Sequence, residues 1–325
     1  MALTIGILAR PPRPAASAWK TFPPRRRGSD SPFPFTVSTA RPAVGKAFSE
    51  QDMTLYRAAP TDGVAWITGG SSGIGRAVAK ELAAAGFTVC VTARDEDPID
   101  LLIAEAGTLS GRILSYPCDV TDEKRMAATA AAIEAEVGPV VLAVFNAGAY
   151  VPIAGENMSV RKFRRTFDVN VMGVVHGLVP VVRHMRERAR GQIVFVGSVS
   201  AYFGWPTTAA YGASKAALNQ IAESLKFDLD KINIRIQVAN PGFIDTPLVR
   251  HSEFHMPALM PADAAARRMV AGIRRGGFEI SFPRRLTWAL KLLSVLPRPF
   301  CQWLLTKLTR WEKRPLAFGR KPPAR

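Results

Sequence analysis

Tyr211 and Lys215 are the first residues whose types and spacing suggest chemistry. They stand four positions apart in Tyr-Gly-Ala-Ser-Lys, inside a run whose apolar pattern predicts a helix over residues 209–229. Residues four apart on a helix face the same side, so the phenol and the ammonium would be neighbours. A phenol ordinarily titrates near pH ~10, and an ammonium beside it favours the phenolate and lowers that pKa. The pair therefore predicts an acid–base centre in which Tyr211 exchanges a proton with the substrate.

Ser198 is a third candidate for the same centre. It follows a strand predicted over residues 192–197, and its hydroxyl can donate to a substrate oxygen on which negative charge develops. Each of these residues alone has an ordinary explanation, as a strand-end cap, a packed aromatic or a surface charge. Their order along the chain, behind a glycine-rich turn, is what favours catalysis.

That turn lies between a strand predicted over residues 64–68 and a helix predicted over 74–85. It reads Thr68-Gly69-Gly70-Ser71-Ser72-Gly73-Ile74-Gly75. Glycines here permit a tight turn, close backbone approach to a pyrophosphate and close packing of helix on strand, while the helix N-terminus favours negative charge. The strand–turn–helix context therefore predicts a dinucleotide site.

The spacing TGxxxGxG, rather than GxGxxG, resembles the classical short-chain dehydrogenase/reductase family, and the resemblance covers roughly Val64 to Phe282. It implies a catalytic tetrad of Asn170, Ser198, Tyr211 and Lys215. Ser198 precedes Tyr211 by 13 positions, as in the family. Asn170, in Phe-Asp-Val-Asn-Val-Met-Gly, matches the family's helix Asn, which holds a water that links the lysine to solvent.

The resemblance also implies a set of cofactor contacts along the carboxyl ends of the strands. In similar enzymes the acid matching Asp119 meets the adenine amino group, and the stretch that ends in Thr246 meets the nicotinamide carboxamide. Two positions depart from the family's pattern, because Phe145 and Gly197 stand where Asn and Ser are usual. The expected contacts are Thr68, Gly69, Ser71, Ser72, Gly73, Ile74, Gly75, Arg94, Asp119, Val120, Asn146, Ala147, Gly148, Tyr211, Lys215, Pro241, Gly242, Ile244 and Thr246.

The end of the second predicted strand bears on the choice of cofactor. An acid there would hydrogen-bond the adenosine ribose and select NAD, but the chain reads Thr92-Ala93-Arg94. A guanidinium can pair with a 2′-phosphate and stack on adenine, so Arg94 predicts NADP(H). Asp95 beside it leaves NAD(H) as the alternative.

Short apolar runs alternate with Ala-rich helical stretches from Val64 onward. Strands that are apolar on both faces and alternate with helices are typical of a parallel sheet covered on each side. We therefore expect one α/β domain over 61–283, a Rossmann-like doubly wound sheet of about seven parallel strands. The strands are predicted over 64–68, 87–93, 112–118, 140–145, 192–197, 232–239 and 278–282, with helices that include 74–85, 123–137 and 209–229.

The net charge of +17 on this chain of 325 residues is concentrated at its two ends. Residues 1–60 hold nine Lys/Arg against three Asp/Glu, and residues 284–325 hold eleven against one. The body is therefore nearly neutral, which argues against a nucleic-acid groove across the fold. The Pro- and Arg-rich residues 1–60 are predicted to form a disordered arm. A transit peptide or a natural start at Met53 are the two alternatives for it.

Three cysteines, Cys90, Cys118 and Cys301, have neither paired nor CxxC spacing. This pattern indicates neither a disulfide framework nor a zinc site, and it fits a reducing, cytoplasmic location. His251 and His255 have the spacing of metal ligands, but no third ligand is evident nearby, so we expect no metal.

Apolar side chains crowd the segments expected to rim the substrate pocket. They predict either a bulky apolar substrate or packing of a lid over the cofactor, with similar weight. The residues are Tyr202, Phe203, Trp205, Phe243, Met256, Leu259 and Met260.

The segment 284–325 is predicted to be a basic tail with two short helices. Pro297, Arg298 and Pro299 interrupt it, so no run is long enough to span a bilayer. In its second half, Phe300, Trp303, Leu304, Leu308 and Trp311 share a face opposite Gln302, Thr306 and Thr309. Such a face fits peripheral binding to an anionic membrane surface, or packing on the fold or on a partner subunit.

The predicted function is hydride transfer between NADP(H) and a carbonyl or secondary alcohol, and the predicted substrate is a bulky apolar molecule. The alternatives are a non-catalytic NADP-binding sensor or scaffold on the same fold, and a 3-oxoacyl-[acyl-carrier-protein] reductase. The family resemblance implies a homodimer or homotetramer.

Overall fold

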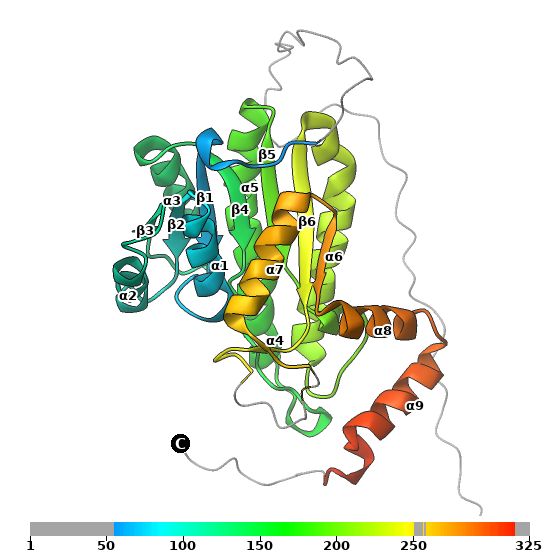
Figure 1. The fold of residues 1–325 in the computed structure, drawn as a ribbon. Coiled ribbons are helices and arrows are strands. Elements are labelled where there is room, and N and C mark those ends of the chain that lie inside the picture. Colours follow the sequence, from blue (N-terminus) through cyan, green and yellow to red (C-terminus); the bar gives the residue numbers. More distant parts are fainter. Residues whose placement is uncertain (1–54, 250–255, 257, 316–325) are drawn as a thin grey trace, which may run out of the picture. The chain divides into compact units, whose positions relative to one another are not determined.

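A parallel sheet of seven strands forms the centre of the protein in this computed structural model, which describes residues 55–249, 256 and 258–315 (Figure 1). The strand order is β3-β2-β1-β4-β5-β6-β9, and every neighbouring pair is parallel. The strands are β1 (Val64–Thr68), β2 (Thr88–Thr92), β3 (Arg112–Ser115), β4 (Val140–Phe145), β5 (Gly191–Val196), β6 (Ile234–Pro241) and β9 (Glu279–Phe282). The predicted doubly wound sheet is thereby confirmed.

Helices cover both faces of this sheet. One face carries α1 (Gly73–Ala84), α2 (Asp97–Glu105) and α7 (Ala262–Arg275), and the other carries α3 (Glu123–Glu136), α5 (Gly173–Glu187) and α6 (Ala209–Leu229). The sequence of strand β1 is almost entirely apolar because both of its faces are buried. Ala65 and Ile67 join the first hydrophobic cluster, while Val64 and Trp66 join the second. Successive side chains of a strand point to opposite faces, so both sets must be apolar.

The strand order reverses between β1 and β4. The chain runs outward from β1 to β3 and then returns to place β4 on the other side of β1. In open α/β sheets, ligands bind at this switch point, outside the carboxyl ends of the strands. Two short strands, β7 (Ile244–Asp245) and β8 (Met260–Pro261), pair separately and follow β6 at that same edge.

Residues 55–59 fall within the range predicted for the N-terminal arm and are among the described residues. The chain divides into units Met1–Asp52 and Met53–Arg325, and residues 55–59 are hydrogen-bonded to the body of the second unit. Tyr56 N donates to Asn233 Oδ1 at 2.8 Å, and Ala58 N donates to Gln192 Oε1 at 2.9 Å. The Arg235 guanidinium donates to the carbonyls of Tyr56 and Leu55. The predicted arm otherwise lies outside the described residues.

Two helices, α8 (Arg284–Ser294) and α9 (Arg298–Thr309), follow β9. They form a third hydrophobic cluster in which Leu290, Leu293, Cys301 and Leu305 are buried together with Val199 and Phe203. In Figure 1, α8 is drawn next to the lower end of α6, and α9 extends away below it. Among the described helices, none combines the length and the hydropathy needed to cross a bilayer.

Candidate active site

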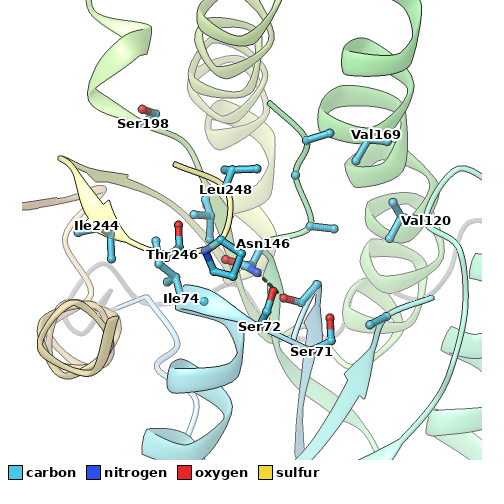
Figure 2. Close-up of a pocket in the computed structure, with 18 of the residues that line it drawn as sticks. Ser71, Ser72, Ile74, Val120, Asn146, Val169, Ser198, Ile244, Thr246 and Leu248 are labelled. Carbon is cyan, nitrogen blue, oxygen red and sulfur yellow. Dashed lines mark hydrogen bonds between the residues drawn. The ribbon is translucent and has the colours of Figure 1, made fainter. Parts of the chain in front are cut away.

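A cleft of about 480 Å³ opens at the carboxyl ends of the central strands. Figure 2 shows Ser71 and Ser72 at its base, Ile244 and Thr246 on one side, and Val120 on the other. This volume falls in the range of ligand pockets, about 300–1,000 Å³. Its walls include the predicted contacts Gly69, Ser71, Ser72, Gly73, Ile74, Arg94, Asp119, Val120, Asn146, Ala147, Gly148, Tyr211, Lys215, Pro241, Gly242, Ile244 and Thr246.

Two predicted contacts, Thr68 and Gly75, support the cleft without being among the residues that line it. A Cβ on Gly75 would lie 2.3 Å from both Gly69 O and Asn146 Nδ2. Only glycine therefore allows helix α1 to approach the turn this closely. Gly69 has a φ of +69°, in the left-handed region that favours glycine.

Asn146 ties the glycine turn to the end of strand β4. Its Nδ2 donates to Gly69 O at 2.8 Å and to Thr68 O at 3.2 Å. In return, Thr68 Oγ1 accepts from Asn146 N at 3.2 Å and from Ala147 N at 3.3 Å. These bonds hold the glycine turn and the loop after β4 together at the switch point.

Asn170 and Lys215 meet at Gly148. Asn170 is fully buried in a π-helical turn, Asp168–Met172, between α4 (Val160–Phe167) and α5. Its Oδ1 accepts from Ala149 N at 2.7 Å, and its Nδ2 donates to Ala149 O at 3.1 Å. A Cβ placed on Gly148 would lie 3.5 Å from Lys215 Nζ and 3.6 Å from Asn170 Oδ1. Turns of this kind inside helices often mark functional sites.

The pKa of Tyr211 moves in the direction opposite to the one predicted from sequence. Burial, with a smaller contribution from the nearby Tyr150, raises it to about 12, although a hydrogen bond with Ser198 acts to lower it. Lys215 does not reverse this, because burial lowers the pKa of its own ammonium to about 8. Its Nζ donates to Val196 O at 2.6 Å. The loss of solvent around the buried phenol therefore raises its pKa more than the attraction to Lys215 lowers it. The spacing of two residues in a sequence does not reveal how deeply they are buried.

A chain of hydrogen bonds runs behind Ser198. Ser198 N donates to Asn240 Oδ1 at 3.0 Å, and Asn240 Nδ2 donates to Glu279 Oε1 at 3.0 Å. Glu279 also accepts from Tyr202 Oη at 2.5 Å and from Lys291 Nζ at 2.5 Å. Burial acts to raise the pKa of Glu279, but these hydrogen bonds and the Lys291 charge outweigh it and lower that pKa. The backbone of Ser198 is thus connected to helix α8.

Tyr150 is a residue of the site that the sequence did not indicate. Its ring meets that of Tyr211 edge to face, with centroids 5.3 Å apart and planes at 70°. Its hydroxyl shares a hydrogen bond with Thr207 Oγ1 at 2.8 Å. The one available signal was its place, two residues after Gly148 at the carboxyl end of β4. Arg165 and Leu248 also line the cleft and were not predicted.

A second, smaller cavity of about 70 Å³ is also lined by Ser198 and Tyr211. Of the apolar residues predicted to rim a substrate pocket, Trp205, Phe243 and Met256 line it. Phe203 and Tyr202 belong instead to the cluster under α8 and α9, and Met260 is buried in the core on the α7 side of the sheet. Leu259 is about half exposed. His251 and His255 lie outside the described residues.

Arg94 and Asp119 face each other at the adenine end expected for the cleft. Both line it, and Arg94 is exposed. Burial acts to raise the pKa of Asp119, but hydrogen bonds from Thr121 and the charges of Arg94 and Arg125 lower it. These interactions therefore favour the carboxylate form of Asp119. Asp95 lines the same stretch of the cleft.

Comparisons with known proteins agree with this geometry. The family described as short chain dehydrogenase matches residues 63–256. An uncharacterized oxidoreductase of Myxococcus xanthus is 35% identical over 235 residues, which make up 72% of this chain and 93% of that protein. The 3-oxoacyl-[acyl-carrier-protein] reductase MabA of Mycobacterium tuberculosis is 35% identical over 184 residues, 57% of this chain and 70% of that protein.

A solved structure, that of a short-chain dehydrogenase from Streptomyces avermitilis, has a TM-score of 0.63 and 26% identity, and the match covers 77% of this chain and 96% of that one. The chain belongs to the short-chain dehydrogenase family, and it is an oxidoreductase that uses a nicotinamide cofactor. The glycine turn fits such a cofactor, because side chains at Gly69 and Gly75 would collide with neighbouring backbone.

Proposed function

We propose that this protein is an NADP(H)-dependent oxidoreductase that transfers a hydride between the nicotinamide and a carbonyl or secondary alcohol. The proposal rests chiefly on the position of Ser198, Tyr211 and Lys215, which line the same cleft as the glycine turn. A dinucleotide with its pyrophosphate on the turn would extend toward these three side chains. The second cavity is also lined by Ser198 and Tyr211, so a substrate in it would lie beside these hydroxyls.

In the proposed reaction, the bound cofactor supplies the hydride for reduction and accepts it in oxidation. The hydroxyls of Ser198 and Tyr211 polarise the substrate oxygen, and Tyr211 gives it a proton as negative charge develops. Since its pKa is raised to about 12, Tyr211 carries that proton at neutral pH, which favours reduction. Lys215 and Asn170, which meet at Gly148, are assigned the return of the proton from solvent.

Arg94 supports the choice of NADP(H) over NAD(H). It is exposed on the wall of the cleft near Asp119, where a guanidinium can pair with a 2′-phosphate. Asp95 on the same wall could instead accept from a ribose hydroxyl, so NAD(H) is the alternative cofactor.

The proposed substrate is apolar and bulky. Val199, Trp205, Phe243, Leu248 and Met256 line the second cavity. The similarity to a 3-oxoacyl-[acyl-carrier-protein] reductase favours a 3-oxoacyl-[acyl-carrier-protein] as the second candidate substrate.

The proposed assembly is a homodimer or homotetramer in a reducing, cytoplasmic compartment. Val179 on α5 and Phe227 on α6 expose apolar side chains of the kind that helix packing between subunits would cover. Each of the three cysteines is buried and free.

The decisive experiment measures NADPH oxidation by the full chain against retinoid, steroid, quinone, short carbonyl and 3-oxoacyl panels, with Tyr211→Phe as the comparison. We expect turnover with at least one panel. Loss of a general acid costs about 10²–10⁴-fold, so turnover should fall by at least ~100-fold in the variant. NADPH affinity, measured by calorimetry, should stay within a factor of about three because the glycine turn is intact. Equal rates for the two proteins would support the non-catalytic sensor or scaffold.

A further inference from the structure

Helices α8 and α9 carry a concentration of exposed apolar side chains. We define the tail face as Trp288, Leu292, Val295, Leu296, Phe300, Trp303 and Leu308, whose exposed fractions run from 38% to 77%. Monomeric soluble proteins rarely leave a large apolar patch exposed, and seven exposed apolar side chains on two consecutive helices and the residues that join them therefore indicate an interaction site. Trp288, Leu292 and Val295 follow the i, i+4, i+7 spacing of one face of α8.

The tail face is not the side by which these helices hold on to the protein. That role belongs to Leu290, Leu293, Cys301 and Leu305, which are buried with Val199 and Phe203. Lys291 adds the ion pair with Glu279. The two helices are therefore apolar on two sides, and only one of them is used within the described chain. The tail face would therefore be stabilised by a second apolar environment that removes it from water.

The charges around the tail face have one sign. Within the described chain, the tail's ion pairs join Lys291 to Glu279, Lys307 to Glu312, and Arg314 to Glu156. Five further cations make no ion pair with the residues that the structure describes. They are Arg284, Arg285, Arg298, Arg310 and Lys313. Glu312 is the one acid of residues 284–325, so the surface presents cations beside exposed tryptophans.

We propose that the tail face is a docking surface for an anionic lipid bilayer. Apolar side chains flanked by Lys and Arg match the boundary between acyl chains and anionic headgroups. Trp288 and Trp303 are suited to that depth, because an indole combines a large apolar ring with a polar N–H. The inference goes beyond the chemistry of the cleft and does not depend on it.

A second copy of the chain fits this surface less well. A two-fold interface places the same patch on both sides, so the unpaired cations of one copy would face those of the other. An anionic bilayer instead supplies the missing opposite charge and the missing apolar environment together.

The test is cosedimentation of the full chain with vesicles of phosphatidylcholine alone and of phosphatidylcholine with phosphatidylglycerol. One variant, Leu292→Ser/Leu308→Ser, removes apolar contacts, and its control is Leu101→Ser, at a similarly exposed position on α2. A second, Arg284→Glu/Arg285→Glu, reverses charge at the start of α8. Its control is Arg267→Glu/Arg268→Glu, an exposed adjacent pair on α7.

We expect the protein to pellet with the anionic vesicles and to be released by salt. Each juxtamembrane cation contributes roughly a fivefold factor in partitioning, so the charge-reversal variant should bind at least about tenfold more weakly. The Leu292→Ser/Leu308→Ser variant should also bind more weakly, and both controls should bind like the parent. Failure to pellet, or equal binding by tail variants and controls, would overturn the proposal. A change in molecular mass confined to the leucine variant, with vesicle binding unchanged, would show that a second copy covers the tail face.

Discussion

The ammonium of Lys215 lies 5.7 Å from the ring centroid of Tyr211, and its hydrogen bond goes to the carbonyl of Val196, not to the phenol. Both side chains are buried, and burial lowers the pKa of Lys215 to about 8 while raising that of Tyr211 to about 12. Between these values the phenol keeps its proton and the lysine loses its own. The two groups therefore titrate in the order opposite to their order in water.

This order predicts an alkaline limit for carbonyl reduction. Below a pH of about 8, Lys215 is charged and can return a proton, and above it that capacity is lost. We expect kcat/KM for the carbonyl substrate to fall above pH ~8, since this parameter reports ionisations of the free enzyme. Lys215→Arg, whose guanidinium stays charged, should move the limit to higher pH. A parent profile that stays flat to pH ~10 would contradict the assignment.

Arg94 should control the preference between the two nicotinamide cofactors. Hydrogen bonds to charged groups are worth about 1.5–3 kcal/mol, so Arg94→Ser should lower kcat/KM for NADPH by ~10-fold or more. The value for NADH should change little, because NADH has no 2′-phosphate. Arg125→Ser is the matched control, since Arg125 also acts on Asp119 but is not among the residues lining the cleft. An equal loss with both cofactors would remove Arg94 from this role.

Gly75 should tolerate no side chain. In Gly75→Ala the new Cβ would lie 2.3 Å from Gly69 O, so the turn must move or α1 must retreat. Overpacking of this kind costs about 1–3 kcal/mol. We expect a lower free energy of unfolding in urea and weaker NADPH binding by calorimetry. Gly155→Ala serves as control, because nothing lies within 4 Å of its added Cβ. If Gly75→Ala matched Gly155→Ala in both measurements, the close approach would be unimportant.

The Lys291–Glu279 ion pair should stabilise the fold and set its acid sensitivity. Loss of one partner leaves a half-buried carboxylate, which costs about 1–3 kcal/mol, so Lys291→Met should unfold at lower urea concentrations at neutral pH. Lys231→Met is the comparison, because Lys231 and Asp228 form an exposed pair, 72% and 82% exposed, and such pairs contribute little.

The pH dependence of that stability has a defined sign. The pKa of Glu279 is lowered in the folded protein, so its contribution is present above the unfolded value and is lost as the pH falls through the folded one. Without Lys291 the folded pKa rises, and the loss should begin at higher pH. Urea unfolding between neutral pH and pH ~4 measures this shift. Identical pH dependence in parent and variant would mean that Lys291 does not act on Glu279.

Local patterns predicted most of the sheet and the residues of the cleft. Strands β1 and β4 have the predicted ends, because short apolar runs bounded by glycine, proline or charge define a buried strand closely. The site followed from motifs whose spacing reflects geometry, such as Tyr211 and Lys215 on one helix turn. Tyr150 belongs to no such pattern, and its contact with Tyr211 exists only after β4 and α6 are assembled.

Interactions between segments that are far apart in the chain could not be predicted from the sequence. The pairing of Glu279 with Lys291 depends on where α8 lies, and two charged residues at this separation are unremarkable in a sequence. The direction of the Tyr211 pKa was wrong because it depends on how much protein surrounds the phenol. The packing of Leu290 and Leu293 on Val199 could not be predicted either, because an amphipathic pattern does not determine which apolar surface a helix packs against.

The hydrogen bonds of Arg235 join segments that are far apart in the sequence, and this affects how the chain folds. The Arg235 guanidinium joins Leu55 and Gly276, residues on opposite sides of it in sequence, and the contact with Leu55 spans 180 positions. The hydrogen bonding of strand β1 is likewise complete only when β4 has formed, because β1 pairs with both β2 and β4. Contacts of such long sequence separation slow folding, and they leave strand edges unpaired meanwhile. During synthesis, β1 therefore lacks one of its two partners until β4 has emerged, and an unpaired strand edge of this kind favours aggregation in that interval.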